Sequence, residues 1–411
     1  MQNPIFVILA GGIGKNFAPL VTNKTVFPFF GQPFIAHTLE MIRQAGASEA
    51  IVVCNKENRE LIDSLSSRQL NIQTVVQNEA SGQADALMLV RSLVGERAMI
   101  VLNAVDMLDP QVLKKFVKQA PHTYAQILGM RVKEYFLGGY LQINGERVTK
   151  VIEKPVQGQE PSDIANLFFH YFSKPQDLFA LLEQEQAKNG DDVYERALDK
   201  LLQQQVVNFF VYDSYWRKLK QAHHVLDITA LFLELKLERK ISRSAYIDKQ
   251  ASISGPVYVG ERARILAGAV VVGPAYIGDD VVIGNHSLVR NSIVEAGSNI
   301  GFGSEIARSY IGPNCQLHHN FIGDSVLEAK VNPSYGTCTA NLRFDGQPVI
   351  CKLPGQKIAT TKTKLGAIMA KGVFLGINCS ILPGITLGEN ATAYPNSVIS
   401  QAVGAGESWK K

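Results

Sequence analysis

At 411 residues the chain is too long for one ordinary hydrophobic core, and this length favours two domains. Hydrophobic residues make up 46% of the chain and charged residues 19%, which is typical of a globular protein with a packed interior. A formal net charge of +4 without a run of basic residues argues against nucleic acid or a membrane surface as a partner.

The cysteines and the apolar segments indicate a compartment. The five cysteines are scattered and odd in number, and none have the CxxC spacing, so we expect reduced thiols and no metal site among them. The apolar run at 5–10 is too short for a secretion signal, and no later stretch approaches the ~20 apolar residues of a membrane span. We therefore expect a cytoplasmic protein with no membrane or nucleic-acid partner.

The first hundred residues alternate between apolar strands and helical patterns. Residues 5–10 predict a buried strand, because they are continuously apolar and are followed by glycines. The loop at 11–14 (Gly-Gly-Ile-Gly) could bring backbone N–H groups to a phosphate, although a tight turn gives the same pattern. Further strands are predicted at 50–54, 72–77 and 99–104, and helices at 33–45 and 84–93. This alternation predicts a Rossmann-like, doubly wound α/β sheet with ligands at the carboxyl ends of its strands.

The second half of the chain contains a repeat of six residues. Neither a helix nor an ordinary strand has that period, but a coil that turns a corner every six residues does. The aliphatic residue of each repeat then points inward and stacks on its equivalent one coil away. These positions are Ile247, Ile253, Val259, Ile265, Val271, Ile277, Ile283 and Val289. The period predicts a left-handed parallel β-helix of hexapeptide repeats.

Between these two parts lie a strand at 206–212 and a helix at 222–239 with an apolar stripe. We interpret the helix as a linker onto the coil, with a domain boundary near 240–245. The expected organisation is an α/β domain at 1–230, a linker helix at 222–243, a β-helix at 244–402 and a tail at 403–411.

The segment 9–20, with the sequence LAGGIGKNFAPL, resembles the signature loop of the sugar-1-phosphate nucleotidylyltransferases. The segment from Gly82 resembles that family's base-recognition motif GTAxA, Glu153-Lys154-Pro155 resembles its sugar-binding EKP motif, and Asn166 fits the strand that follows. The resemblance implies that Asp106 binds Mg²⁺. It also implies that substrate and nucleotide are bound by Gly11, Gly12, Gly14, Lys15, Lys24, Gln77, Gly82, Glu153, Lys154 and Asn166.

With the repeats behind it, the whole chain resembles the bifunctional glucosamine-1-phosphate acetyltransferase/N-acetylglucosamine-1-phosphate uridylyltransferase family. Two breaks in the repeat, at 317–324 and 335–346, resemble the HxxYxGD and GTxTxNxDG patterns of the acetyltransferase half. The resemblance implies that His318 deprotonates a sugar amine and that Asn341 orients the substrate. It further implies that Gly366, Ala367 and Lys364 hold acetyl-CoA and that the chain forms a homotrimer through the β-helix.

Several residues depart from the family patterns. The signature loop has Lys15-Asn16 where the family has Thr-Arg, and a neutral amide cannot replace a guanidinium that stabilises the transferring phosphates. Losing such a group typically costs several kcal/mol of transition-state stabilisation. Val105 replaces a glycine before the metal-binding Asp, Phe321 lacks a substrate-contacting hydroxyl, and Tyr335 replaces a glycine that borders the coenzyme groove.

These departures leave three hypotheses open. The first is an acetyl-CoA-dependent amino-sugar-1-phosphate N-acetyltransferase whose nucleotidyl-transfer site is weakened or lost. The second is an active sugar-1-phosphate nucleotidylyltransferase with an altered loop. The third is a non-catalytic paralogue that binds a nucleotide sugar and regulates a partner.

Overall fold

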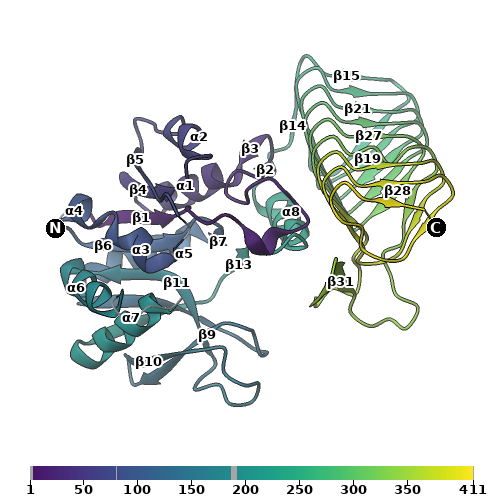
Figure 1. Ribbon diagram of the computed structural model, residues 1–411. Coiled ribbons are helices and arrows are strands. Elements are labelled where there is room, and N and C mark those ends of the chain that lie inside the picture. Colours follow the sequence, from purple (N-terminus) through teal and green to yellow (C-terminus); the bar gives the residue numbers. More distant parts are fainter. Residues whose placement is uncertain (1–2, 80, 187–191, 411) are drawn as a thin grey trace. The chain divides into compact units, whose positions relative to one another are not determined.

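The computed structural model describes residues 3–79, 81–186 and 192–410. The chain divides into two compact units (Figure 1). The sheet unit consists of Met1–Ile13 and Phe34–Trp216, and the coil unit consists of Gly14–Pro33 and Arg217–Lys411. Each unit is described by itself below.

The sheet unit is built on a mixed sheet with the strand order β5-β4-β1-β6-β11-β8-β12-β10-β9. Strands β5, β4, β1 and β6 are parallel, as the alternation of strands and helices predicts, and β11 is antiparallel to both β6 and β8. The strands are β1 (Ile5–Leu9), β4 (Glu49–Cys54), β5 (Asn71–Val76), β6 (Met99–Asn103), β8 (Ala125–Arg131), β9 (Gly139–Asn144), β10 (Arg147–Glu153), β11 (Ile164–Phe172) and β12 (Val207–Tyr212). The short strands β7 (Asp106–Leu108) and β13 (Trp216–Lys218) lie outside this sheet.

Helices of the sheet unit pack their apolar sides against this sheet. Leu87, Leu182 and Leu198 from different helices share one buried core with Val7 and Val101 of the strands. The helices are α1 (Phe34–Gln44), α2 (Arg59–Asp63), α3 (Gln83–Met88), α4 (Arg91–Val94), α5 (Pro110–Gln119), the short 3-10 helix η2 (Ala120–His122), α6 (Pro175–Gln186) and α7 (Val193–Gln204).

The single helix predicted at 84–93 is two short helices, α3 and α4. The backbone tightens between them, because the N–H group of Val90 bonds to the carbonyl of Leu87, three residues back rather than four. By contrast, α5 begins where its sequence predicts a helix start. Asp109 accepts a hydrogen bond from the N–H group of Gln111 at 2.9 Å, and Pro110 occupies the first turn.

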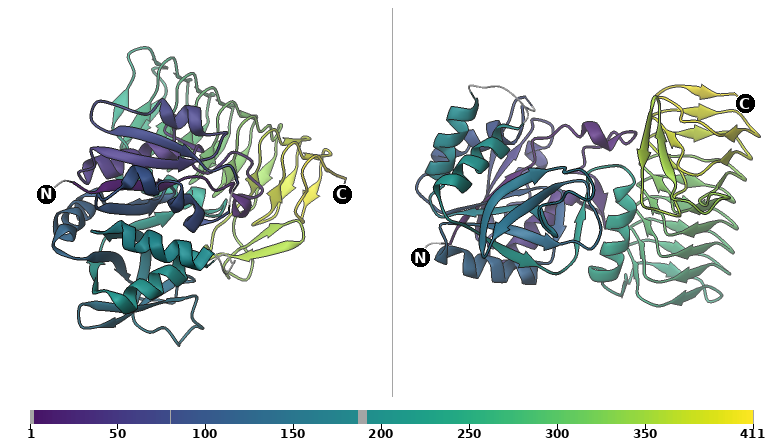
Figure 2. Two further views of the ribbon diagram at one scale, coloured as in Figure 1. Left: turned by 60° about the vertical axis from the view of Figure 1, so that its left-hand side comes forward. Right: turned by 90° about the horizontal axis from the view of Figure 1, so that it is seen from below.

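The coil unit contains a left-handed parallel β-helix whose strands stack along its axis (Figure 2). One sheet consists of β14 (Lys240–Ile241), β17 (Val257–Val259), β20 (Ala275–Ile277), β23 (Ile293–Val294), β26 (Tyr310–Ile311), β29 (Val326–Leu327), β33 (Ile368–Met369) and β36 (Thr386–Leu387). Another consists of β16 (Ser252–Ser254), β19 (Val270–Val272), β22 (Leu288–Arg290), β25 (Glu305–Ala307), β28 (Phe321–Gly323), β30 (Cys338–Thr339), β35 (Ser380–Ile381) and β38 (Val398–Ile399). The remaining ladder strands are β15 (Tyr246–Ile247), β18 (Arg264–Ile265), β21 (Val282–Ile283), β24 (Asn299–Ile300), β27 (Gln316–Leu317), β34 (Phe374–Leu375), β37 (Thr392–Ala393) and β39 (Ser408–Trp409).

The interior of the β-helix confirms the period of six. Ile265, Ile277 and Val289 are fully enclosed in one core that runs along the whole coil. Ile247 and Ile253 are only partly buried, because they belong to the first coil and have a neighbouring coil on one side only.

Three details of the coil unit differ from the sequence expectation. The linker helix is α8 (His224–Leu235), and the next residues are extended, since β14 already pairs with β17. The β-helix continues into the stretch expected to be a tail, where β39 pairs with β37. A hairpin of β31 (Ile350–Leu353) and β32 (Gln356–Ala359) follows the second break in the repeat.

The segment that follows the glycine loop belongs to the coil unit, which the sequence analysis did not anticipate. It contains the 3-10 helix η1 (Lys15–Phe17) and a tight hairpin of β2 (Pro28–Phe29) and β3 (Gln32–Pro33). The hairpin turn has positive φ angles at both central residues, Phe30 and Gly31, as two-residue hairpins favour. Among the described residues, no helix is long and apolar enough to cross a membrane.

Candidate functional site

The glycine loop after β1 lies against the start of α3 in the sheet unit. The N–H group of Ala10 bonds to the carbonyl of Val53 at 2.7 Å, which holds the chain beside β4. A Cβ atom on Gly11 would lie only 2.5 Å from the side-chain oxygen of Gln77, so a larger residue there would displace the Gln77 amide. The side-chain amide of Gln77 in turn donates to the carbonyl of Gly82 at 3.2 Å. Three predicted binding residues from separate segments are therefore brought together.

The predicted metal ligand, Asp106, begins β7 just beyond the carboxyl end of β6. One carboxylate oxygen accepts a hydrogen bond from the side-chain amide of Asn103, and the other accepts one from the indole of Trp216, both at 3.2 Å. The described residues contain no group of three or more His, Cys, Asp and Glu side chains placed to hold a metal ion. A lone carboxylate still fits a magnesium ion that takes its other ligands from substrate phosphates and water.

The predicted sugar-binding residues converge around Gly139, at the start of β9. A Cβ atom on this glycine would clash with the carboxylate of Glu153 and would lie 3.4 Å from the Cβ of Asn166. The sequence analysis missed Gly139, although the Gly138-Gly139 pair ahead of a strand was a possible signal. It also missed Glu195, whose pKa is raised by burial and by the nearby charge of Glu153.

Other predicted nucleotide-binding residues have different surroundings. Lys154 follows β10 in the left-handed backbone region and donates its N–H group to the carbonyl of Gly138 at 3.0 Å. Gly14, Lys15 and Lys24 belong to the coil unit. The side chain of Lys15 lies outside the described part of the structure.

The candidate acyl-transfer residues of the coil unit lie at the two ends of β28. His318 is exposed at the corner before this strand, and its N–H group bonds to the side chain of Asn320 at 2.5 Å. Asp324 follows the strand and contacts Asn341 of the next coil. The three residues of β28 span about 10 Å at the usual rise per residue. Among the described residues, no hydrogen bond joins His318 to Asn341.

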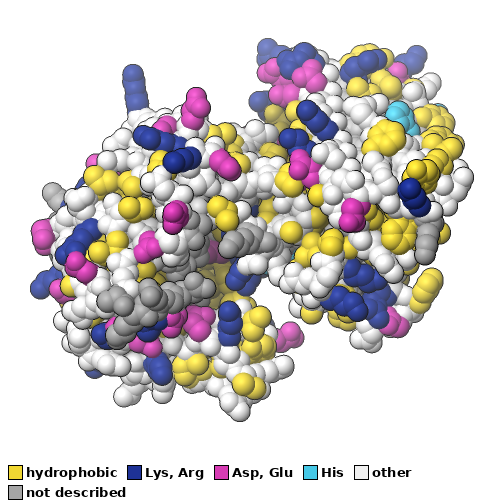
Figure 3. All heavy atoms as spheres, viewed as in Figure 1, with side chains coloured by type: hydrophobic (Ala, Val, Ile, Leu, Met, Phe, Trp, Pro, Cys, Tyr) yellow, Lys and Arg dark blue, Asp and Glu magenta, His cyan; other side chains and the backbone are white. Residues whose placement is uncertain are grey.

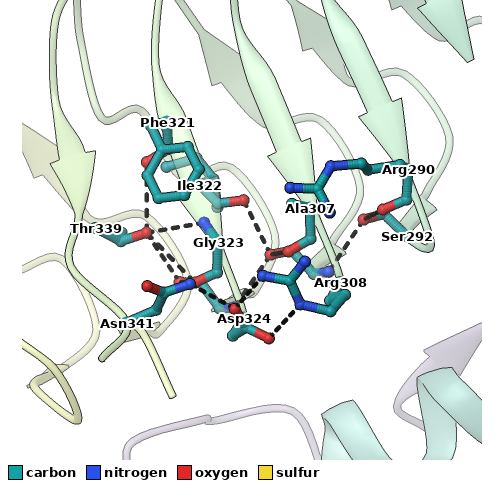
Figure 4. Close-up of polar contacts among 12 residues, drawn as sticks. Arg290, Ser292, Ala307, Arg308, Phe321, Ile322, Gly323, Asp324, Thr339 and Asn341 are labelled. Carbon is teal, nitrogen blue, oxygen red and sulfur yellow. Dashed lines mark hydrogen bonds and ion pairs between the residues drawn. The ribbon is translucent and has the colours of Figure 1, made fainter. Parts of the chain in front are cut away.

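Asp324 is the centre of a polar network (Figure 4). The guanidinium of Arg308 contacts both of its carboxylate oxygens at 2.7 Å, and the side-chain amide of Asn341 donates to one of them at 2.6 Å. Only 9% of the Asp324 side chain is exposed, so its carboxylate is shielded from water, whereas Arg308 is 35% exposed. These contacts with Asp324 raise the pKa of Arg308. Neither Arg308 nor Asp324 was predicted from the sequence as a site residue, although Asp324 ends the motif that contains His318.

Comparisons with known proteins show which family the chain belongs to. The sequence pattern of the nucleotidyl transferase family matches residues 5–232, which is more than half of the chain. The chain belongs to the nucleotidyl transferase family. A second pattern, that of the bacterial transferase hexapeptide (six repeats), matches residues 256–291.

Relatives match this chain over nearly its full length. A "bifunctional sugar-1-phosphate nucleotidylyltransferase/acetyltransferase" from Sulfurisphaera tokodaii is 27% identical, with 98% of this chain and 99% of the relative covered. A "bifunctional protein GlmU" from Methanococcus vannielii is 26% identical, with 97% and 95% covered. Among solved structures, apo-UDP-glucose pyrophosphorylase is similar with a TM-score of 0.52 at 17% identity. That match covers 57% of this chain and 100% of the other, and it shows the fold alone.

These findings confirm the predicted family, the two-part fold and the prediction that the chain is a transferase.

Two of the predicted coenzyme-binding residues of this chain lie beside Asp324. The N–H group of Gly366 bonds to the carbonyl of Asp324 at 2.8 Å, and that of Ala367 bonds to the hydroxyl of Ser325 at 3.0 Å. Both N–H groups are therefore occupied by the coil itself. Lys364 is exposed, and its backbone pairs with that of Leu342 at the base of the segment 343–363.

Tyr335, which replaces a glycine of the acetyltransferase pattern, belongs to an exposed aromatic stack on the β-helix. Its ring lies 5.2 Å from that of His319, and the stack continues through Phe302 to His286. Figure 3 shows histidine beside hydrophobic side chains on the visible face of the β-helix. Tyr335 is 55% exposed, so it adds to the surface of the coil and does not fill its interior.

Proposed function

We propose that this protein is an acetyl-CoA-dependent N-acetyltransferase that acts on an amino-sugar 1-phosphate in its β-helix. The observation that carries the proposal is the network of Arg308, Asp324 and Asn341. A carboxylate can only accept hydrogen bonds, so the amide of Asn341 must donate its NH₂ group to Asp324. The amide oxygen of Asn341 is then left to accept a hydrogen bond from an amine.

The chemistry requires a base, an oriented amine and an acyl donor. Acetyl-CoA supplies the acyl group when it is bound. His318 takes the proton from the sugar amine, for which a histidine is suited because its pKa normally lies near neutral pH. The amide oxygen of Asn341 holds the amine in the orientation in which its nitrogen reaches the thioester carbon. A C–N bond forms, the C–S bond breaks, and the coenzyme leaves as the thiol.

In one chain His318 and Asn341 lie beyond opposite ends of β28, and no hydrogen bond joins them among the described residues. We propose that a second copy completes the site and that the assembly is a homotrimer through the β-helix. The bifunctional names of the full-length relatives support an acetyl-transfer role for this half of the chain. A cytoplasmic location remains a prediction from the reduced cysteines.

A second candidate, sugar-1-phosphate nucleotidyl transfer, is favoured by the convergence of Gly11, Gln77 and Gly82. Asn16 in place of the arginine of the signature loop argues against a fast reaction. Magnesium-dependent release of pyrophosphate from a nucleoside triphosphate and a sugar 1-phosphate tests this candidate, and Asp106 is the residue that would hold the ion.

The decisive experiment measures acetyl-CoA consumption with glucosamine-1-phosphate and with galactosamine-1-phosphate. Turnover that disappears in His318→Ala supports the proposal. No turnover with either sugar, together with calorimetric binding of a nucleotide sugar, would instead favour the non-catalytic regulatory paralogue. Turnover that persists unchanged in His318→Ala would contradict the assigned base.

A further inference from the structure

A buried histidine in the sheet unit connects Asn166 to a buried tyrosine. His170 lies on β11 and is fully enclosed, and each of its ring nitrogens lies within hydrogen-bond distance of a side chain. Nδ1 lies 2.7 Å from the hydroxyl of Tyr194, and Nε2 lies 3.0 Å from the side-chain oxygen of Asn166. Burial lowers the pKa of His170 to about 3, so the ring is neutral at physiological pH and carries a single N–H group.

The position of that proton follows from Tyr194. Its side chain is buried, and burial raises its pKa well above the ordinary value, so the hydroxyl keeps its proton. Among the residues that the structure describes, this hydroxyl has no hydrogen-bond acceptor other than Nδ1 of His170. A buried O–H group without an acceptor is costly, so Tyr194 donates to Nδ1. The proton of His170 is therefore on Nε2, from which it is donated to Asn166.

This proton fixes the orientation of the Asn166 amide. Because Nε2 donates, the amide must meet it with its oxygen, and its NH₂ group points away from His170. Asn166 is half-buried, so the NH₂ group is accessible to a ligand. Beside it lies Glu153, whose carboxylate shares with Asn166 the space over the side-chain-free Gly139. A donor beside a carboxylate suits a polyhydroxylated ligand, since one ligand oxygen can accept from Asn166 while a neighbouring hydroxyl donates to Glu153.

We propose that Tyr194 and His170 are positioning residues that make Asn166 a hydrogen-bond donor, so that this subsite selects a sugar whose facing oxygen accepts a hydrogen bond. The inference rests on the sheet unit binding a sugar phosphate or nucleotide sugar. It is independent of acetyl transfer in the β-helix. An acyl carbonyl oxygen or a hydroxyl oxygen meets the requirement, whereas a protonated amine does not.

The first test is the binding of UDP-N-acetylglucosamine and UDP-glucose to the full chain by calorimetry. Asn166→Asp keeps the shape of the side chain but turns an oxygen toward the ligand, so the Kd should rise at least tenfold. Tyr194→Phe removes the group that fixes the tautomer and should weaken binding by two- to fivefold. Tyr171→Phe, a buried tyrosine on the same strand, is the matched control and should leave the Kd unchanged.

The second test needs no ligand and separates positioning from packing. The ¹⁵N chemical shifts of the His170 ring should report the Nε2–H tautomer in the wild type and a mixture in Tyr194→Phe. A wild-type Nδ1–H tautomer, or an Asn166→Asp variant that binds as tightly as the wild type, would overturn the proposal. Absence of nucleotide-sugar binding to the wild type would also overturn it, whereas the acetyl-transfer proposal is judged separately by acetyl-CoA consumption.

Discussion

Glu328 offers the sharpest test of how the coil unit holds the segment that follows the glycine loop. This residue follows β29 and is 2% exposed. Its carboxylate accepts hydrogen bonds from the backbone N–H groups of Val21 at 3.2 Å, Thr22 at 2.7 Å and Lys371 at 2.8 Å. In the preceding coil Gly312 takes the equivalent place, so the glutamate adds contacts that the repeat itself does not require.

Substitution of Glu328 removes these contacts. Hydrogen bonds to a charged group contribute about 1.5–3 kcal/mol each, and Glu328→Ala leaves all three N–H groups without their acceptor. Since water can enter and recover part of this energy, we expect the Ala variant to weaken the docking of Val21 and Thr22 by about 3–6 kcal/mol. Glu328→Gln keeps one acceptor oxygen and should cost about 1–3 kcal/mol.

Hydrogen exchange of the backbone amides measures this docking directly. Because each 1.4 kcal/mol corresponds to a factor of ten, exchange at Val21 and Thr22 should accelerate about a hundredfold to ten-thousandfold in Glu328→Ala. The Gln variant should show about a tenfold acceleration. Glu389→Ala, on a later coil, is the control and should leave both amides protected. Unchanged protection at Val21 and Thr22 in the Ala variant would refute the reasoning.

Three further predictions concern the sites and the pH dependence. Asp324→Asn removes the fixed acceptor of Asn341 and should lower the rate of acetyl transfer about ten- to a hundredfold. Because Arg308 also loses its carboxylate partner, the variant should be less stable, and the rate is compared at a temperature at which it remains folded. A variant with a lower Tm but an unchanged kcat would indicate that Asp324 has a structural role only. Asn16→Arg should raise magnesium-dependent pyrophosphate release if the rest of the loop is competent, and no rise would indicate a closed pocket. Burial lowers the pKa of His224 to about 3, below its unfolded value, so its contribution to stability is complete above pH 6.5 and is lost as the pH falls toward 3. In His224→Asn the unfolding free energy should therefore fall less steeply on acidification, by about 1.4 kcal/mol per pH unit. Denaturant titrations at several pH values measure this, and the same pH dependence in the variant and the wild type would contradict it.

The path of the coil could be predicted from the sequence, but the docking of the segment at 14–33 could not. An inward aliphatic residue at every sixth position leaves the β-helix few alternatives, and Ile265 and Ile277 are enclosed as expected. Glu295, which accepts a hydrogen bond from the N–H group of Gly31 at 2.9 Å, and Glu328 are buried carboxylates that follow short apolar strands. Their position is a local signal that each carboxylate has a partner in the interior. Their partners lie 264 to 307 residues away in sequence, and no local pattern specifies such a pairing.

In the candidate sites, too, some contacts could be predicted from the sequence and others could not. Gly11, Gln77 and Gly82 come together because the parallel strands β1 and β5, on either side of β4, end at the same edge of the sheet, which the strand pattern predicts. Arg308 and Asp324 are 16 residues apart, and they meet only because one coil happens to have this length. To predict this pairing, the number of residues in that coil must be known. The breaks in the repeat of six make that number difficult to read from the sequence.

On this reasoning Asn166 offers a ligand a hydrogen-bond donor, whereas Asn341 offers an acceptor. In each case a neighbouring side chain fixes the orientation of the amide. Asp324 can only accept, so Asn341 is left with an oxygen that accepts from a ligand. His170 donates from Nε2, so Asn166 is left with an NH₂ group that donates. On this reasoning the β-helix site favours a free amine, and the sheet unit favours an oxygen such as the carbonyl that acylation of that amine creates. The two sites would then bind the amine and its acylated product respectively, and each would discriminate against the ligand of the other.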